Sequence, residues 1–343
     1  MSKVRLQLAT EYPPPGEDAF TRQLTEMLRK KVAEDYPTGI TWRGAHAEHH
    51  GCVKAEFVVE PNLPPELRVG VFREPRTYPA WVRFSNQGGV PKPNIDKDIL
   101  GMAVKSVAVE GEKLLEDEKS ERTQDSLLIS HPVFVTKDVK EFAHLIEATM
   151  SGVLRLGWFF LNPFDLHLRV LRNLLASRRQ CANPLEIRYW STTPYQFGAG
   201  AVKYSARPHA AETALPPRPL PDDFLKEALK RSLAGGDFYF DFVVQFQKDP
   251  FRMPIEDPGA LWSEKRSPFC KVATIRIPAQ EFDSAAQMAF GENFSFTPWH
   301  SLPDHRPLGG INRARKEVYR AISEFRHRKN AVPRKEPHSI SEN

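Results

Sequence analysis

One stripe of the predicted C-terminal helix carries two arginines and a tyrosine. At about 100° per residue, Arg315, Tyr319 and Arg326 line up roughly 80° from the apolar face of the helix. An arginine one turn before a tyrosine can donate a charge-assisted hydrogen bond to the phenol oxygen. The stripe is either a set of amphipathic side chains at a core boundary or a binding surface, and the helix alone leaves both interpretations open. The apolar face itself consists of Ile311, Ala314, Val318, Ile322 and Phe325.

Three histidines lie close together in RGAHAEHHG, residues 43–51. His46 and His50 would share one face only on a helix, whereas Gly44, Gly51 and the strand-like residues that follow argue against one, so a bare metal site is not favoured. The chain also has no glycine-rich nucleotide loop, no HExxH motif and no GxSxG elbow. The sequence therefore gives no support to nucleotide binding, zinc proteolysis or serine-hydrolase chemistry.

Composition narrows the class of protein further. The 343 residues are 41% apolar, enough for one large core or two smaller domains, and 30 prolines favour long irregular connections over a helical bundle. The net charge of +5 comes without a basic run that alternates with aromatics, so nucleic acid is not an expected partner. Three distant cysteines, no signal peptide and no apolar stretch long enough for a transmembrane segment are typical of a soluble cytoplasmic protein.

Apolar periodicity divides the chain into the elements that must position these side chains. Helical spacing covers residues 17–35, 137–149, 151–180 and 310–328. Strand patterns cover residues 51–60, 80–87, 101–111, 126–136, 186–208, 237–247 and 271–282. Two groups of strands with inserted and C-terminal helices predict an α+β fold, and strands that are apolar on both faces favour a closed antiparallel β-barrel.

Several segments, in this order, resemble the catalase superfamily. They are RGAHAEHHGCVKAEFVV (43–59), WVRFSNQGG (81–89), DILGMAVKSVAVEG (98–111), TQDSLLISHPVFVTKDVKEF (123–142) and EDPGALWSEKRSPFCKVATIRIPAQ (256–280). The C-terminal helix is similar to the family's proximal haem-binding helix, in which arginine, three residues, tyrosine, six residues and arginine recur. The resemblance covers residues 43–328 and implies a catalase-like closed antiparallel β-barrel with inserted and C-terminal α-helices.

The chain is much shorter than a typical catalase and resembles the small catalase-related haem proteins of the mini-catalase type. We expect it to lack the long N-terminal arm, the wrapping segment and the C-terminal helical extension of the larger enzymes. The expected organisation is a loose N-terminal arm over residues 1–16, a single catalase-like haem domain over residues 17–328, and a disordered tail over residues 329–343.

On the proximal side, the resemblance implies haem b as cofactor, with Tyr319 as the iron ligand. A free phenol has a pKa near 10, so its ionisation at neutral pH costs about 4 kcal/mol, which Fe(III) ligation and Arg315 would offset. By the same resemblance, Arg43, Arg83 and Arg326 would meet the haem propionates, since guanidinium groups match carboxylates well.

On the distal side, the resemblance implies that His46 is the acid and base that moves a proton between the two peroxide oxygens. Ser85 would orient the imidazole through its second nitrogen and so fix the tautomer. Phe134 and Phe142 match positions that line the family's pocket, but each is equally well explained as an ordinary core aromatic.

The sequence departs from the family at the distal asparagine. Either Ile129 or Ser130 takes its place, depending on a one-residue shift, and neither offers an amide donor. Ser130 could donate one hydroxyl hydrogen bond in its stead, so we include it among the candidate catalytic residues. Losing a positioned donor can lower the rate by orders of magnitude, so efficient dismutation of hydrogen peroxide is not assured. Small Gly44 and Ala45 before His46 would open the space over the iron.

Residues 152–175 combine large apolar side chains with Arg155, Arg169 and Arg172. They form either a helix packed on the barrel or an apolar mouth with a basic rim suited to a fatty-acid hydroperoxide and to peripheral lipid contact. The expected partners are therefore a small-molecule peroxide or a lipid hydroperoxide, and we expect a monomer or a small homo-oligomer.

Three hypotheses for function follow. The first is a haem-dependent hydroperoxidase, catalase-like or peroxidase-like, that cleaves the O–O bond of hydrogen peroxide or of an organic hydroperoxide. The second is a catalase-related lyase or isomerase of fatty-acid hydroperoxides. The third, from another class, is a haem-binding or peroxide-sensing protein with little turnover.

Overall fold

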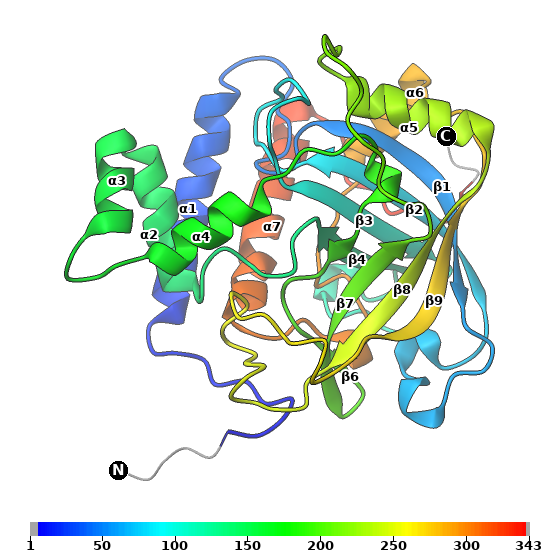
Figure 1. Cartoon of the computed structure of the whole chain (residues 1–343), viewed down its shortest axis with the longest axis horizontal. Helices are drawn as coiled ribbons and strands as arrows, with labels where there is room; N and C mark the ends of the chain where they lie inside the picture. Colours follow the sequence, from blue (N-terminus) through cyan, green and yellow to red (C-terminus); the bar gives the residue numbers. More distant parts are fainter. Residues whose placement is uncertain (1–5, 341–343) are drawn as a thin grey trace.

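Eight antiparallel strands close into a barrel in the computed structural model of the chain, which describes residues 6–340 (Figure 1). The sheet order is β5-β4-β3-β2-β1-β9-β8-β7, pairing of β5 with β7 closes the ring, and β6 extends β7. The strands are β1 (His49–Val59), β2 (Thr77–Asn86), β3 (Leu100–Val107), β4 (Thr123–Ile129), β5 (Tyr189–Trp190), β6 (Tyr195–Phe197), β7 (Gly200–Pro208), β8 (Phe238–Phe246) and β9 (Cys270–Ile277). The predicted closed antiparallel barrel is confirmed.

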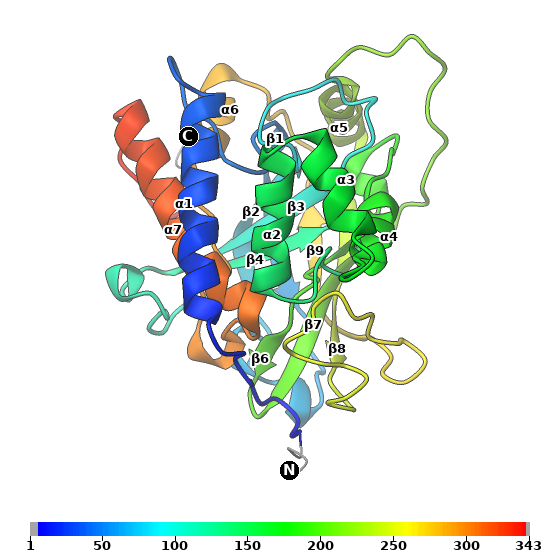
Figure 2. The same cartoon turned by 90° about the vertical axis from the view of Figure 1, so that its left-hand side faces the viewer.

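Seven α-helices surround the barrel within residues 6–340. They are α1 (Glu17–Asp35), α2 (Val139–Met150), α3 (Val153–Leu161), α4 (Leu168–Ser177), α5 (Phe224–Gly235), α6 (Ala285–Asn293) and α7 (Gly310–Asn330). Helix α1 lies beside α7 and α2, and α3 with α4 projects at the edge of the molecule (Figures 1 and 2). None of these helices has both the length and the apolar character that a membrane span requires.

Side chains in the strands alternate between the barrel interior and its outer face. On β8, Phe240, Phe242 and Val244 are buried in the main core, as the alternation of this strand predicts. On β2 and β3, Phe84 and Met102 also point inward. The residues that alternate with these along each strand therefore point outward, toward the segments that cover the barrel.

The apolar face of α7 packs against α1 and α2. Ile311 and Ala314 form a second core cluster with Leu24 of α1 and Val139 of α2. Helix α2 begins where Asp138 accepts a hydrogen bond from the backbone N–H of Glu141 at 2.8 Å, which satisfies one free donor of the first turn. The amphipathic pattern of residues 310–328 thus predicts both the helix and the face that it buries.

One predicted strand is shorter than expected, and one predicted helical region is interrupted. Strand β4 ends at Ile129 instead of running to residue 136, and Ser130 turns the chain away with its backbone N–H bonded to Leu100 O at 2.9 Å. The predicted helical region 151–180 divides into α3 and α4, because the segment between them contains Pro163, which has no N–H to continue a helix.

Ion pairs with distant residues hold both ends of the described chain, within the segments for which the sequence predicts a loose arm (1–16) and a disordered tail (329–343). In the arm, Glu11 forms ion pairs with Arg306 and Arg313. In the tail, Glu336 is buried and forms an ion pair in which its Oε2 lies 2.7 Å from Lys105 Nζ. The partners lie far away in the sequence, so composition could not reveal them. Residues 1–5 and 341–343 of these predicted segments lie outside the described part.

Candidate functional site

A histidine and a serine meet on the outer face of the barrel. Nδ1 of His46 lies 3.0 Å from Oγ of Ser85, the hydrogen bond that the sequence predicts for this pair. Ser85 faces Gly101 on β3, and facing partners in a sheet share a face. A Cβ at Gly101 would lie 2.5 Å from His46 Nδ1 and 2.9 Å from Ser85 Oγ. The imidazole therefore lies directly against the backbone of Gly101, and no other residue type would fit at position 101 without movement.

The loop between α1 and β1 holds His46 in an uncommon backbone conformation. Its φ is 57°, in the left-handed region that only a few per cent of non-glycine residues adopt. The backbone N–H groups of His46 and Ala47 donate to Gln87 O at 2.9 Å and to Gly88 O at 3.1 Å. These bonds compensate the strain and direct the ring toward β3, and such strain is concentrated at functional sites.

The His46 imidazole is neutral over the physiological range. Burial and, as smaller causes, the positive charges of Arg83, Arg315 and Arg43 together lower its pKa to about 3. A neutral ring whose Nδ1 is held by Ser85 presents Nε2 as the nitrogen that can take up or release a proton. Arg315, in the first half of α7, is thus one of the charges that act on this histidine.

On α7, the guanidinium of Arg315 is hydrogen-bonded to the phenol of Tyr319; this pair is called the α7 clamp below. Its Nε and Nη2 both donate to the Tyr319 oxygen, at 3.2 and 2.7 Å, and its plane lies over the ring at 4.8 Å. Both hydrogen bonds come from one guanidinium, so they fix the two side chains relative to each other. The predicted contact between these two residues, one helical turn apart, is present.

A buried asparagine orients the arginine. Asn312 is fully buried, and its Oδ1 accepts from Arg315 Nη1 at 3.3 Å and from Thr193 Oγ1 at 3.1 Å. Its Nδ2 donates to the carbonyls of Pro194 and Leu308 at 2.9 and 3.1 Å. Because these bonds fix the amide from both sides, the Arg315 side chain is held in place by the segment that follows β5.

Three arginines from three distant segments converge on Glu292 of α6. Arg43 Nη1 lies 2.9 Å from this carboxylate, Arg83 Nη2 lies 3.3 Å from it, and Arg326 Nη1 lies 3.5 Å from it. Arg326 also donates to Glu292 O at 2.7 Å, and Arg43 donates to Phe294 O. The three arginines predicted to act together therefore do lie together.

The arginine cluster carries more positive charge than its carboxylate can balance. Burial, with Arg43 as a second cause, lowers the pKa of Arg83 to about 9 and that of Arg326 to about 10. Arg83 is only 3% exposed, and its Nε is buried without a hydrogen-bond partner. Three guanidinium groups against one carboxylate leave a surplus of two positive charges, which suits a dianionic ligand.

The outer face beside His46 is apolar and incompletely covered. Ile129 faces Gly101 across β3 and β4, so its side chain shares the face of Ser85. Ile129, Leu127 and Ala103 are only half-buried, as are Tyr319 and Ile322 on α7. A bound apolar group could cover these partly exposed side chains further.

Ser130 is turned away from that face. Its Oγ accepts from Leu100 N at 2.9 Å, and its own N–H donates back to Leu100 O at 2.9 Å. Between the two candidates for the distal position, Ile129 is thus the one whose side chain points outward, while the Ser130 hydroxyl retains one hydrogen to donate.

Phe134 and Phe142 stack edge to face with their centroids 5.1 Å apart. Both pack on the cluster that joins α1, α2 and α7, which includes Val318 beside Tyr319. Phe142 also contacts the cluster beneath α3 and α4. The two rings therefore form a wall between α7 and the α3–α4 hairpin.

The other two histidines of the motif do not join His46. His50 is buried, with Nε2 3.1 Å from Asn86 Oδ1, while Nδ1 of His49 is buried without a partner. Within residues 6–340, no three or more His, Cys, Asp or Glu side chains are grouped as metal ligands would be.

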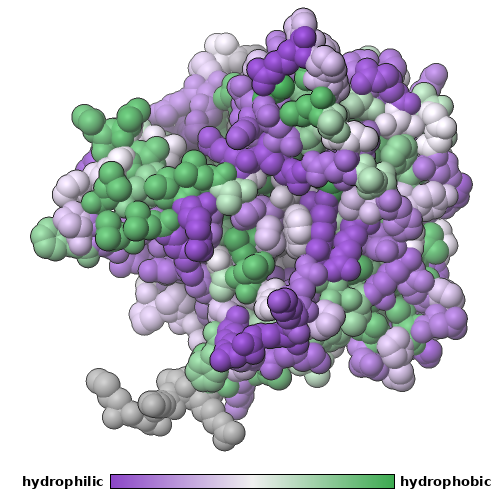
Figure 3. Space-filling model, in the orientation of Figure 1, coloured by the Kyte–Doolittle hydropathy of each residue, from purple (hydrophilic) through white to green (hydrophobic). Residues whose placement is uncertain are grey.

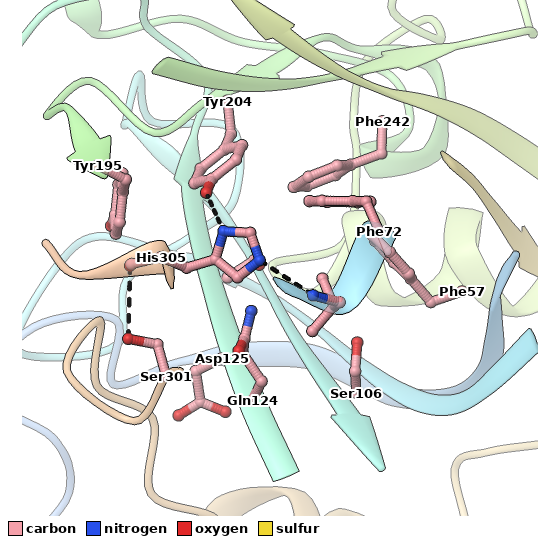
Figure 4. A pocket seen from close by; sticks show the side chains of 12 residues that line it. Phe57, Phe72, Ser106, Gln124, Asp125, Tyr195, Tyr204, Phe242, Ser301 and His305 are labelled. Atoms are coloured by element: carbon pink, nitrogen blue, oxygen red, sulfur yellow. Dashed lines mark hydrogen bonds between the residues drawn. The ribbon is translucent and has the colours of Figure 1, made fainter. Parts of the chain in front are cut away.

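A small cavity inside the barrel is lined by none of the candidate site residues (Figure 4). There, His305 accepts from Val71 N at 3.1 Å through Nε2, and its Nδ1 lies 3.2 Å from Tyr204 Oη. Burial lowers the pKa of His305 to about 3. Both ring nitrogens have partners, and the rings of Phe72 and Phe197 pack against the imidazole with centroids 5.5 and 5.7 Å away, so this histidine has a structural role.

Sequence reasoning missed three residues of the site. Asn312 could have been found from its helical spacing, since it lies one turn before Arg315. Gly101 stands in a strand, where glycine often marks the close approach of another group. Glu292 carries no local signal, because α6 reaches the arginines only in three dimensions.

Comparisons with known proteins identify the fold. No protein-family model and no curated protein matches the sequence. The structure is similar to a fungal catalase (TM-score 0.67, 16% identity, 95% of this chain and 66% of that chain). It is also similar to a bacterial catalase (TM-score 0.62, 15% identity, 100% and 68%) and to catalase A from Saccharomyces cerevisiae (TM-score 0.66, 17% identity, 95% and 68%). The chain has a catalase-like fold and spans about two thirds of the length of these catalases.

Proposed function

We propose that this protein is a haem-dependent hydroperoxidase that cleaves the O–O bond of hydrogen peroxide or an organic hydroperoxide. The observation that carries the proposal is the α7 clamp, in which Arg315 donates two hydrogen bonds to the Tyr319 oxygen. A guanidinium that holds a phenol oxygen in place suits that oxygen to be a ligand of the Fe(III) of haem. A tyrosine that served only in packing would not need such a partner.

The residues around the α7 clamp fit haem b. Its two propionates would balance the two surplus positive charges of Arg43, Arg83 and Arg326, and would give the buried Nε of Arg83 a partner. The half-buried apolar side chains on β3, β4 and α7 would cover the faces of the macrocycle. Tyr319 would be the metal ligand.

Bound there, haem would supply an electrophilic Fe(III) centre that polarises the hydroperoxide. Neutral His46 would accept a proton at Nε2 from one peroxide oxygen and return it to the other, which then departs. Ser85 keeps Nδ1 engaged, so that the proton moves only at Nε2. Phe134 and Phe142 would exclude water from one side.

A lyase or isomerase acting on a fatty-acid hydroperoxide is the second candidate. The observation that favours it is the outward direction of Ile129, one of the two residues that the resemblance aligns with the distal amide donor of catalases. An apolar distal surface weakens the orientation of hydrogen peroxide but accommodates an acyl chain. Ser130, whose Oγ bonds to Leu100 N, would act at most through its remaining hydroxyl hydrogen.

The test of haem binding is an absorption spectrum of the protein expressed with ample haem, together with that of Tyr319→Phe. We expect a Soret band in the native protein. In the variant we expect altered charge-transfer bands and a several-fold lower haem content, because the axial oxygen is gone. Tyr239→Phe, a change on the outside of β8, is the matched control. An unchanged spectrum and haem content in Tyr319→Phe would show that the axial assignment is wrong.

The reaction is tested separately from haem binding. Oxygen evolution from hydrogen peroxide would indicate catalase-like turnover, whereas consumption of a conjugated-diene hydroperoxide without oxygen release would favour the lyase or isomerase. A Soret band with neither activity would indicate a haem-binding or peroxide-sensing protein. In each active case, His46→Ala should abolish the chemistry and leave haem bound, and activity that survives this change contradicts the role of His46.

A further inference from the structure

The α3–α4 hairpin is the most apolar exposed surface in the described chain. Of the 16 large hydrophobic side chains that are exposed within residues 6–340, nine lie between Met150 and Leu175. Leu154 and Phe164 are 92% and 93% exposed, so they contact almost nothing in the protein. In Figure 3, hydrophobic surface gathers over the region of α3 and α4. The remaining members are Val153, Trp158, Leu161, Leu166 and Leu168.

Helix α3 is apolar on both of its sides. Its inner side carries Phe160, which is buried with Leu145 of α2 and Val170 of α4. Its outer side carries Leu154 and Trp158, one turn apart and both exposed. A helix with apolar residues all round is normally covered on every side. The inner cluster already stabilises the hairpin, so its outer apolar stripe is not needed to hold it on the protein.

Unpaired arginines accompany this apolar surface. Residues 151–180 contain five arginines and only one acidic residue, Asp165. Arg169 and Arg179 have carboxylate partners. By contrast, Arg155 and Arg172, one on each helix, form no ion pair within residues 6–340 and are exposed. Uncompensated positive charge beside exposed apolar side chains matches the chemistry of an anionic lipid surface.

We propose that the α3–α4 hairpin is a peripheral membrane-binding element, which inserts its outer apolar side chains among the headgroups of an anionic bilayer. The hairpin projects from the molecule instead of lining a groove (Figures 1 and 2), and a convex apolar tip suits a soft lipid surface better than a folded protein partner. Trp158, on the outer stripe, is the residue type that favours the level of the headgroups.

The hairpin adjoins the wall of the candidate site. Phe142 belongs both to the cluster beneath α3 and α4 and to the cluster that contains Val318 of α7. Docking through the hairpin would therefore bring the candidate site close to the bilayer. Membrane binding does not depend on the proposed haem chemistry, because the hairpin contains none of the candidate site residues.

Flotation of the full-length protein with vesicles tests the proposal. We expect binding to phosphatidylcholine vesicles that contain about 30% phosphatidylglycerol, at least tenfold weaker binding to pure phosphatidylcholine, and weakening at high salt. Trp158 emission should shift to shorter wavelength on binding, measured as the difference between the native protein and Trp158→Phe, since five other tryptophans are present.

Matched variants separate insertion from surface apolarity in general. Leu154→Ser with Phe164→Ser should weaken vesicle binding at least tenfold and leave the folded structure intact, because both side chains already face solvent. Phe251→Ser with Leu261→Ser, at positions 69% and 63% exposed in the β8–β9 connection, should leave it unchanged. Arg155→Gln with Arg172→Gln should remove most of the preference for anionic vesicles.

Two outcomes would overturn the proposal. One is a native protein that stays with the soluble fraction for every vesicle composition. The other is a native dimer that the Leu154→Ser and Phe164→Ser double variant converts to a monomer without any vesicle binding, since the apolar face would then serve contact between two copies. Sedimentation velocity without lipid distinguishes these results.

Discussion

The geometry of the His46–Ser85 pair depends on the absence of a side chain at Gly101. The imidazole lies where a Cβ of that residue would stand, and Ser85 Oγ lies almost as close. The backbone of His46 is itself in the left-handed region, so the ring cannot relax without releasing the hydrogen bonds of its loop. At the scale of single residues, the candidate site is therefore a rigid arrangement in which small displacements matter.

Gly101→Ala is expected to displace the His46 ring and lower hydroperoxide turnover about a hundredfold, because a misplacement of about 1 Å in a proton-transfer group has effects of that size. Haem content should change little, since Tyr319 lies on a different element. The measurement is initial rate together with the Soret band. Gly235→Ala, where an added Cβ meets nothing within 4 Å, is the control. Full activity in Gly101→Ala would contradict the role of His46.

Helix α6 contributes a single carboxylate to the arginine cluster. This negative charge reduces the repulsion among the three guanidinium groups. Glu292 is mostly buried and contacts Arg43, Arg83 and Arg326. Without it, three buried positive charges would face one another. The position of α6 against the outer side of β1 and β2, where Phe290 and Phe294 pack on Trp81, brings the carboxylate to them.

Glu292→Gln should lower the free energy of unfolding of the haem-free protein by about 2 kcal/mol, because it leaves buried guanidinium charge without its counter-ion. If propionates occupy the cluster, haem should restore most of this loss. Chemical denaturation with and without haem measures both effects. Glu281→Gln, at an exposed position before the same helix, serves as control. A variant as stable as the native protein would show that the cluster does not depend on Glu292.

The C-terminal segment after α7 is held by a buried ion network. Lys105 of β3 is completely buried between Asp125 and Glu336, each at 2.7 Å. Glu336 also accepts from Thr123 Oγ1 at 2.9 Å. The two nearby carboxylates raise the pKa of Lys105 against the effect of burial, so its ammonium is charged in the folded protein.

Lys105→Met should therefore destabilise the protein more than Glu336→Gln does. The first change leaves two buried carboxylates without their cation, at a cost of about 3 kcal/mol or more, whereas the second leaves Lys105 paired with Asp125 and costs about 1–2 kcal/mol. Urea denaturation gives both values. Arg122→Met, which breaks the exposed pair with Glu110, should cost less than about 0.5 kcal/mol. The reverse order for the two buried changes would contradict this account of the tail.

For the molecule as a whole, buried neutral histidines limit stability in acid. His50 and His305 are 1% and 2% exposed, and burial lowers their pKa values to about 4 and about 3. An unfolded chain takes up protons on histidine from about pH 6.5 downward, while these two residues stay unprotonated in the folded state. The unfolded state thus binds more protons, and folding stability falls as the pH drops below 6.5.

The expected loss is about 1 kcal/mol for each of these two histidines per pH unit, continuing until the folded pKa values near 4 and 3 are reached. Thermal unfolding between pH 7 and pH 4 measures it. His305→Gln keeps a hydrogen-bonding side chain but cannot titrate, so its stability should fall less steeply with acidity than that of the native protein. An equal slope in both proteins would mean that His305 does not contribute.

What the sequence determined by itself is local. Alternation in residues 237–247 predicts a strand, the apolar face of residues 310–328 predicts a helix and its buried side, and the four-residue interval between Arg315 and Tyr319 predicts their contact. Each follows from the backbone period of two residues in a strand or 3.6 residues in a helix, because that period appears in the sequence as the spacing of side chains on one face. The resemblance of ordered segments extended this to the closed barrel, which is confirmed. The roles of the site residues remain predictions.

What only the tertiary structure decided is which distant groups meet. Lys105 and Glu336 are 231 positions apart, and Glu292 reaches three arginines from separate segments. Ile129, rather than Ser130, faces outward beside His46, because the register of β3 with β4 sets the face of each residue. No local repeat carries this information. These contacts form because the closed sheet and the helices around it bring distant segments together. A charge that is buried there needs a partner, which a residue far away in the sequence can provide.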